Sequence, residues 1–338
     1  MKKVLLIVLV FLSAEGSAQD EVKGYLSLGV KKAEQLTSLY IQPLSEGLMY
    51  GLTGGWYNSA EVNKKWELDF SIIANGSFVP KDKLSTEIDI SRFENLEVKG
   101  GGNKVTIPTI FGSTDATVTF IATVDDDKYE FDAPTGIGLL SANLLPNAFL
   151  QASLGLPANT ELSFRVFPKQ NLDDASVGEF GFGLKHELSK SIKSLNELPI
   201  SISAFAAYTR LDADYTFQVN GLITGESQFV DVNIKTFQLE LLVSTKNPTW
   251  NLYGGVGYVT GGANYSLKGT YVIETQNETL TFVDPFNVHS DISGMRACFG
   301  GKVSLGRFGI NVDYTFQGYN NAALGLNYTL LKGKAEVE

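Results

Sequence analysis

The stretch NTELSFRVFP, Asn159–Pro168, decides how the whole chain is interpreted. Apolar and polar side chains alternate at its centre in the order Leu162, Ser163, Phe164, Arg165, Val166. Successive side chains of a strand point to opposite faces, so the stretch predicts a strand with one apolar and one polar face. In a soluble sandwich the apolar face meets the core, whereas in an outer-membrane barrel it meets lipid and the charges face inward.

The first 18 residues predict a secretory signal peptide. Lys2 and Lys3 precede the apolar run Val4–Leu12, and small residues follow up to Ala18, where cleavage is expected. The apolar run is too short for a membrane anchor, which needs about 20 residues. After this segment no run of 18 consecutive apolar residues occurs, so a transmembrane helix is not expected.

Charge and cysteine content exclude several classes of protein. The net charge is −10, and removal of Lys2, Lys3 and Glu15 with the signal peptide would change it by −1 to −11. An acidic exported protein has no electrostatic reason to bind nucleic acid. The single cysteine, Cys298, allows neither an internal disulfide nor a zinc cluster.

Ten segments carry the strand pattern. They are 66–72, 147–156, 159–168, 178–188, 200–210, 231–244, 250–261, 292–305, 308–317 and 321–331. Their even number suits a bacterial barrel with short turns alternating with long loops. We predict an all-β fold, a transmembrane antiparallel β-barrel of about 10–14 strands. The expected parts are the signal peptide (1–18), a plug-like segment (19–62), the barrel (63–332) with a long loop region (80–145), and a tail (333–338).

The polar faces of these strands favour a barrel over a soluble β-sandwich. Charges of both signs that share a narrow lumen can pair across it, and glycines such as Gly181, Gly183 and Gly300 leave room for them. The lumen-facing charges are predicted to be Glu67, Asp69, Glu161, Arg165, Glu179, Lys185, Glu240, Arg296, Lys302 and Asp313. Aromatic residues near the strand ends fit the girdles of a membrane barrel: Trp66, Tyr208, Trp250, Tyr258, Phe308, Tyr314, Phe316 and Tyr328.

The segment before the first strand is expected to be helical or irregular and to act as a short plug. A helix over Lys31–Gln42 should end at Pro43, and a Gly-rich, aromatic stretch follows it. Such a stretch is too apolar to hang free and too irregular to join the sheet; the alternative is a periplasmic arm packed on the barrel rim. The plug residues are predicted to be Pro43, Gly47, Tyr50, Gly54, Gly55, Trp56 and Tyr57.

No motif in the sequence predicts catalysis. His186 shares the apolar face of its strand, and His289 is expected in a long loop, where Ser290 and Asp291 beside it do not amount to a triad without a G-x-S-x-G turn. The acidic run Asp125–Asp127 lacks the spacing of a calcium loop. We therefore expect a protein that is not an enzyme and has neither a cofactor nor a metal site.

Three stretches together resemble a known family. YIQPLSEGLMYGLTGGWYNSA (40–60), LGLPANTELSFRVFP (154–168) and GFGLKHEL (181–188) are similar to uncharacterised barrel proteins related to FadL-type outer-membrane transporters. The resemblance implies a monomeric barrel, of 14 strands in the family pattern, with a hatch in the lumen that would include Gly54–Tyr57. It also implies diffusion of hydrophobic substrates through an opening in the wall. The ligand-pocket residues do not match one by one, so no substrate transfers.

The sequence thus predicts a barrel of the bacterial outer membrane for passive uptake of small hydrophobic molecules, such as fatty acids or aromatic hydrocarbons. Its expected partners are the lipid bilayer, the outer-membrane assembly machinery and a small hydrophobic ligand, with no nucleic acid. The alternative is a structural or surface-interaction barrel whose lumen is closed.

Overall fold

The computed structural model of the protein describes residues 30–93, 95–115, 118–124, 127–138, 144–172, 174–216, 223–274 and 279–333. The predicted signal peptide, residues 334–338 of the predicted tail, and part of the acidic run at 125–127 lie outside the described residues.

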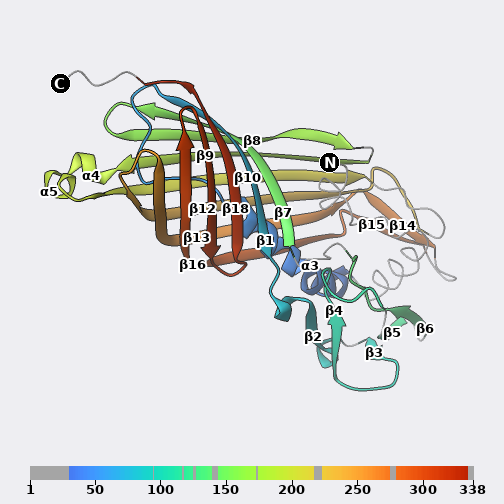
Figure 1. Ribbon diagram of the computed structural model, residues 1–338. Coiled ribbons are helices and arrows are strands. Elements are labelled where there is room, and N and C mark those ends of the chain that lie inside the picture. Colours follow the sequence, from blue (N-terminus) through green and yellow to red (C-terminus); the bar gives the residue numbers. More distant parts are fainter. Residues whose placement is uncertain are drawn as a thin grey trace.

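Ten antiparallel strands form a closed barrel (Figure 1). Closure comes from the pairing of the first strand with both the last strand and β7. The strands are β1 (Leu68–Phe78), β7 (Leu144–Leu156), β8 (Thr160–Leu172), β9 (Ala175–Glu187), β10 (Ile200–Thr216), β12 (Phe229–Thr245), β13 (Trp250–Lys268), β16 (Phe286–Leu305), β17 (Phe308–Phe316) and β18 (Asn321–Leu331). These are the ten predicted segments, which confirms the barrel; the 14 strands implied by the resemblance were wrong.

The opening stretch points its apolar side chains out of the barrel. On β8, Leu162 and Phe164 are 42% and 41% exposed, whereas Ser163 and Arg165 are buried inside. The same alternation runs around the wall, with exposed Leu, Val and Phe outside and polar or charged residues inside. An apolar exterior around a polar interior is the arrangement of a transmembrane barrel.

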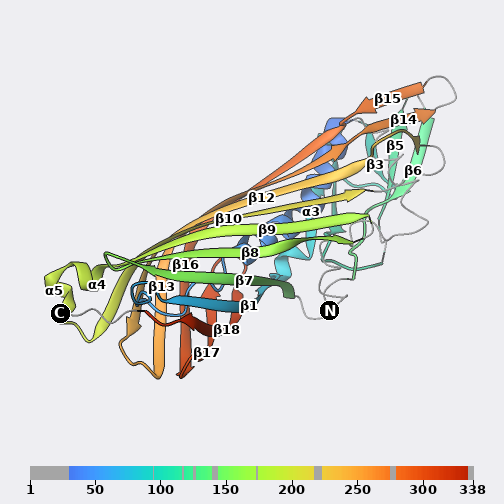
Figure 2. The same cartoon turned by 90° about the horizontal axis from the view of Figure 1, so that it is seen from above.

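The two ends of the barrel differ. At one end, the short-turn end, strands are joined by residues 157–159, 246–249 and 306–307 and by the connection 188–199, which contains the short helices α4 (Leu188–Ser191) and α5 (Lys193–Asn196). The opposite end carries the long segment 79–143, and we call it the lid end. β10, β12, β13 and β16 extend farther toward the lid end than the strands around β18 (Figure 2).

The polarity of the two wall faces inverts along these four long strands. Near the short-turn end of β10, the inward residues Ser201 and Ser203 are polar, whereas the inward Leu211 and Ala213 nearer the lid end are apolar. The outward residues change from apolar to polar along the same strands. The change occurs at a row of paired residues on four adjacent strands: Arg210, Lys235, Gly262 and Asp291. The wall beyond this row has a polar outside and an apolar core, as in a water-soluble protein.

The apolar exterior has the height of a bilayer. On β13 the outward residues from Trp250 to Tyr258 are apolar or glycine, over a length of nine residues, and a tilted membrane strand needs about 9–11. Aromatic side chains mark both limits. Trp66, Trp250 and Phe308 are exposed near the short-turn end, and Tyr258 and Phe316 near the other limit. Among the described residues, no helix is both long and apolar enough to cross a membrane.

A small lid, defined as residues 80–138, sits beyond the barrel at the lid end (Figure 1). Its own core contains Ile88, Phe93, Ile107, Phe120 and Phe131. Its elements are η2 (Lys81–Lys83), β2 (Ser85–Asp89), η3 (Ile90–Arg92), β3 (Leu96–Val98), β4 (Lys104–Pro108), β5 (Thr119–Val124) and β6 (Asp127–Asp132). The strands form two sheets, β2–β4 and β3–β5–β6, so this region adds no strand to the barrel. Ile110 and Phe111 of the lid join the apolar core shared by α3 and the barrel wall.

A third small sheet continues the long side of the wall. It consists of β11 (Ile223–Thr224), β14 (Thr270–Glu274) and β15 (Thr279–Val283). Residues 265–289, the long loop in which His289 was expected, therefore contain the ends of β13 and β16 and the β14–β15 hairpin. His289 lies on β16, outside the membrane band, where its ring contacts Asn264 and Asp291 at 2.7 and 2.8 Å. The loop prediction was wrong because apolar and polar residues still alternate in this part of the strands, but here the polar residues face outward and the apolar residues face inward.

The expected end of the first helix was also wrong. α3 (Val30–Leu52) continues through Pro43 for nine residues. Proline removes one backbone donor and crowds the preceding turn. Ser45 Oγ donates to the carbonyl of Ile41 at 3.1 Å, and the residues after Pro43 are buried on nearly all sides. Packing against the wall therefore outweighs the cost of the proline.

Replacing Leu241 with Arg tests where the membrane band lies. Leu241 is outward on β12 and 47% exposed, so the charge would face hydrocarbon. We expect the free energy of unfolding in lipid vesicles to fall by about 2–4 kcal/mol. Asn287→Arg, on the polar outside of β16, is the control and should change it by less than about 0.5 kcal/mol. The two variants are compared by urea titration. Equally small changes in the free energy of unfolding for Leu241→Arg and Asn287→Arg would contradict a membrane band at Leu241.

Candidate functional site: the filled lumen

Residues 30–67, which we call the inner segment, lead from the lid through the barrel interior to the short-turn end, where Trp66 is exposed at the rim. α3 packs against β16, β1, β7, β12 and β13. The chain after α3 then contacts strands on all sides of the wall before it leads into β1. The lumen is thus occupied by the chain's own N-terminal part, and its contacts fall into an apolar and a polar level.

The apolar level fills the lumen toward the lid end. The last turns of α3 contribute Ile41, Leu44, Leu48, Met49 and Leu52, each at most 7% exposed. They pack on the inward apolar residues of the extended wall, which include Val177, Leu211, Ala213, Ile234, Val259, Ala263, Val288 and Ile292. This contact buries the last turns of the helix and the inverted face of the wall against each other.

The polar level is centred on Arg165, whose side chain is completely buried. Its guanidinium donates to the carbonyl of Gly54 at 2.9 Å and to Gln151 at 3.0 and 3.2 Å. The group also lies between two rings, 4.0 Å from the centre of Trp56 and 4.1 Å from that of Phe149. Planarity, forked donors and affinity for aromatic faces suit arginine to such a site better than lysine.

Wall glycines make room for Trp56. A Cβ atom added to Gly181 would lie 2.9 Å from Trp56 Cζ2, and one added to Gly183 would lie 3.0 Å from Trp56 Cε3. The indole is 3% exposed and contacts Phe205. The small residues of β9 therefore form the hollow that receives the indole ring.

A second buried cation holds the inner segment from the opposite part of the wall. Arg296 Nη1 donates to the carbonyl of Thr53 at 3.1 Å and to Gln238 at 2.7 Å, and its Nε lies 3.5 Å from Glu240. Tyr57 donates to the same Glu240 at 2.8 Å. Two arginines on different strands thus bind backbone carbonyls at Thr53 and Gly54.

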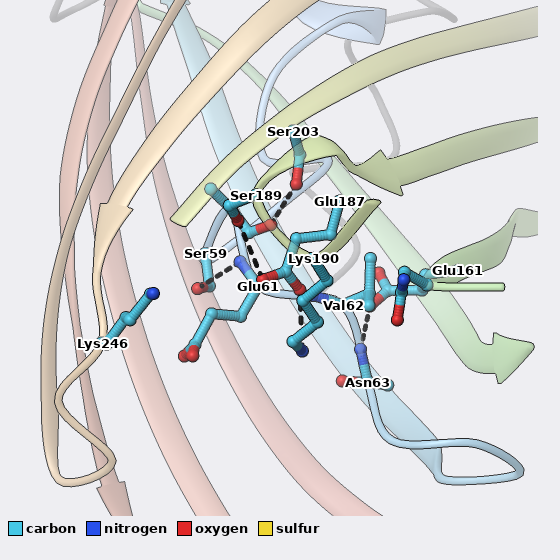
Figure 3. Close-up of polar contacts among 12 residues, drawn as sticks. Ser59, Glu61, Val62, Asn63, Glu161, Glu187, Ser189, Lys190, Ser203 and Lys246 are labelled. Carbon is cyan, nitrogen blue, oxygen red and sulfur yellow. Dashed lines mark hydrogen bonds and ion pairs between the residues drawn. The ribbon is translucent and has the colours of Figure 1, made fainter. Parts of the chain in front are cut away.

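Two carboxylates anchor the segment near the short-turn end (Figure 3). Glu187 accepts a hydrogen bond from the backbone N–H of Val62 at 3.0 Å, and Glu161 accepts one from Asn63 at 2.8 Å. Each carboxylate also pairs with a lysine, Lys190 with Glu187 at 2.9 Å and Lys185 with Glu161 at 3.1 Å. We call Glu161 and Glu187 the carboxylate anchor.

Serine contacts complete this level. Ser203 Oγ donates to the carbonyl of Ala60, and Ser59 Oγ lies 3.1 Å from Ser244 Oγ. Outside the anchor, a polar cavity of about 480 Å³ opens at the short-turn end, lined by residues that include Glu61, Asp69 and Lys302. Within the described part of the chain, no group of three or more His, Cys, Asp or Glu residues could hold a metal ion.

Comparison with known proteins gives one family. A family model described as a family of unknown function (DUF6588) matches residues 1–330. The chain belongs to this family. No curated protein matches the sequence.

Solved structures similar to this DUF6588 protein include outer-membrane proteins of several kinds. Ail, the attachment invasion locus protein of Yersinia pestis, is 11% identical, with 78% of this chain and 98% of Ail covered and a TM-score of 0.25. The outer membrane protease OmpT from Escherichia coli is 10% identical, with 78% and 97% covered and a TM-score of 0.33. A Pseudomonas aeruginosa FadL homologue is 10% identical, with 87% and 98% covered and a TM-score of 0.24. Likeness at this level carries no functional argument.

The predicted lumen-facing charges are found on the inner side of the wall or at its rim. Asp69, Glu161, Arg165, Glu179, Lys185, Glu240, Arg296 and Asp313 are all at most 9% exposed. Glu67 and Lys302 are half-buried beside the short-turn cavity. Arg165, Glu161, Glu240, Lys185 and Arg296 meet the inner segment directly, whereas Glu179 and Asp313 are buried acidic groups within electrostatic reach of Arg165.

The predicted plug residues divide between two kinds of structure. Pro43, Gly47 and Tyr50 belong to α3, whereas Gly54, Gly55, Trp56 and Tyr57 lie in the non-helical stretch after it. The sequence interpretation missed Glu187 and the backbone donors of Val62 and Asn63. Position 187 has the same parity as the inward-facing Glu179 and Lys185, so the sequence could have indicated that Glu187 faces the lumen. Backbone donors cannot be recognised from side-chain identity.

Substituting Glu187 with Gln should loosen the anchor without changing side-chain size. Hydrogen bonds to a charged group contribute about 1.5–3 kcal/mol, so local opening at Val62 should become about 10–100 times more frequent. Hydrogen exchange of the Val62 amide in micelles measures this directly. Glu197→Gln, on the exposed α5 connection, should leave the exchange unchanged; an unchanged rate in Glu187→Gln would rule out the anchor.

Replacing Arg165 with Met should destabilise the barrel far more than the loss of a surface cation. The variant leaves the carbonyl of Gly54 and the side-chain oxygen of Gln151 without their donor, and it removes the positive charge within electrostatic reach of the buried Glu179 and Asp313. We expect a cost of about 3–5 kcal/mol. Arg210→Met removes a solvent-exposed pair with Asp212 and should cost at most about 1 kcal/mol. Urea unfolding in lipid vesicles compares the two, and equal losses would show that Arg165 does not organise the lumen.

Proposed function

We propose that this DUF6588 protein is a bacterial outer-membrane barrel with a closed lumen, whose function lies in the surface that it presents at its lid end. The inner segment acts as a permanent plug in this proposal. The observation that carries it is the packing of the lumen: Arg165, Trp56 and Leu52 are 0%, 3% and 0% exposed at the centre of the barrel.

The outer membrane is supported by the architecture itself. A closed antiparallel barrel leaves no unpaired strand edge in lipid, and its apolar exterior is one bilayer high. A single chain with an even number of strands and short turns at one end fits bacterial outer-membrane barrels. The predicted signal peptide would deliver the chain for export.

Uptake of small hydrophobic molecules, the function favoured by the sequence, has less support from the geometry. A hydrophobic solute needs an apolar cavity, and the apolar level of the lumen is already occupied by α3. Cavities lined by described residues lie at both ends of the molecule: a polar one at the short-turn end, and, at the lid end, one between α3 and the lid and one at the ends of β8, β9 and β10. Transport would require the inner segment to leave its buried contacts with Arg165, Arg296 and the anchor.

Planar-bilayer recordings and vesicle uptake assays test the proposal. The full-length protein, after its assembly has been checked by a heat-dependent change in gel mobility, should show no stepwise conductance. Vesicles that contain the protein should also take up fatty acids or aromatic hydrocarbons no faster than vesicles without it. Stepwise channels, or uptake that rises with the amount of protein, would overturn the closed-lumen proposal and favour the transport function.

The same recordings can be made on a chain that lacks residues 30–60. This variant lacks the residues that fill the apolar and the polar level of the lumen. We therefore expect it to conduct ions, whereas the intact protein does not. Should this variant not assemble, Trp56→Ala combined with Tyr57→Ala removes the two largest side chains of the polar level, and the rate of leakage of small ions from vesicles replaces conductance as the measurement.

A further inference from the structure

The inner segment carries the chain through the barrel in one direction. Gly47 packs on Tyr319 in the turn at the lid end, and a Cβ atom added to Gly55 would lie 3.3 Å from Ala323 Cβ. Farther on, Asn58 donates to Asn327 at 3.1 Å. The contacts advance along β18 toward the short-turn end as the residue number rises. Followed backwards, the chain therefore leaves the lumen at the lid end.

α3 continues in that direction beyond the barrel wall. Glu46 pairs with Lys83 of the lid at 2.8 Å, and the carbonyl of Tyr40 accepts a hydrogen bond from Ile110. Leu36 belongs to the lid core and is 1% exposed. With 23 residues, the helix is about 34 Å long, and its first turns lie alongside the lid, outside the membrane band.

The orientation of the barrel follows from its connections. Short turns face the periplasm and long loops face the outside in bacterial outer-membrane barrels. The long segment 79–143 and the β14–β15 hairpin mark one end, whereas the longest connection at the other end is residues 188–199. The polar exterior beyond Arg210 and Asp291 is likewise suited to water on the lid side.

We propose that α3 emerges from the lumen at the outer surface of the cell, so that the protein presents the first turns of this helix, from Val30 onward, beside the lid. This inference rests on the proposed surface function and extends it: the display site is the rim formed by α3 and the lid. The barrel would then have to close around a segment that already lies across its lumen.

Cysteine labelling of intact cells tests the direction of the inner segment. Lys31 and Lys64 are both exposed lysines at its opposite ends, and Lys81 is an exposed lysine of the lid. The native thiol, Cys298, is buried and is replaced by Ala in every variant. The probe is a maleimide coupled to a polyethylene glycol chain too large for general porins, and labelling is read as a gel shift.

We expect Lys31→Cys and Lys81→Cys to react on intact cells, and Lys64→Cys to react only after the outer membrane is permeabilised. Reaction of Lys81→Cys without Lys31→Cys would refute the threading of α3. Reaction of Lys64→Cys alone would refute the orientation. Neither outcome depends on whether the lumen conducts. The labelling test can therefore contradict the threading of α3 while the closed-lumen proposal holds, and the labelling pattern can be as expected while channel recordings contradict a closed lumen.

Discussion

Buried charge in a narrow lumen is the constraint on which the rest of the structure depends. Ten strands enclose too little space for hydrated arginines and carboxylates to point inward independently, and a buried charge without a partner destabilises a protein by several kcal/mol. The wall nevertheless places Arg165, Arg296 and Glu187 inside. The inner segment resolves the conflict, because its carbonyls at Thr53 and Gly54 accept from the arginines and its N–H groups at Val62 and Asn63 donate to carboxylates. Wall and segment therefore require each other.

The inversion of the wall faces explains why the protein is more than a membrane barrel. Within the bilayer the strands are apolar outside and polar inside; beyond the row at Arg210 and Asp291 the same strands become polar outside and apolar inside. One side of the barrel thus continues as a soluble structure, whose core is completed by α3 and whose end is covered by the lid. A chain designed only to conduct solutes has no evident need for such an extension, and this favours a function at the surface over one in the lumen.

Much of this arrangement could be predicted from alternation alone. All ten barrel strands and the inward direction of residues such as Arg165 and Glu240 follow from the period of two. Other features could not. If the apolar face is assumed to stay outside, the outward strand pattern ends before Leu211 and Ala213, which are apolar and face inward. The sequence pattern therefore predicts loops where the long strands in fact continue. Pro43 ends a helix in water, but not one packed on all sides. Within the inner segment, the partners of Glu161 and Glu187 are backbone N–H groups, and these occur at almost every position of any sequence.

The most direct measurement is a disulfide cross-link between the inner segment and the wall. Ser59 and Ser244 face each other with their hydroxyl oxygens 3.1 Å apart, so substitution of both with Cys brings two thiols into contact. In a Cys298→Ala background, mild oxidation of membranes that contain Ser59→Cys/Ser244→Cys should give an internally cross-linked chain with altered mobility on a denaturing, non-reducing gel, and either single variant should not. A barrel that assembles, as shown by its heat-dependent mobility, yet forms no cross-link would contradict an inner segment that fills the lumen.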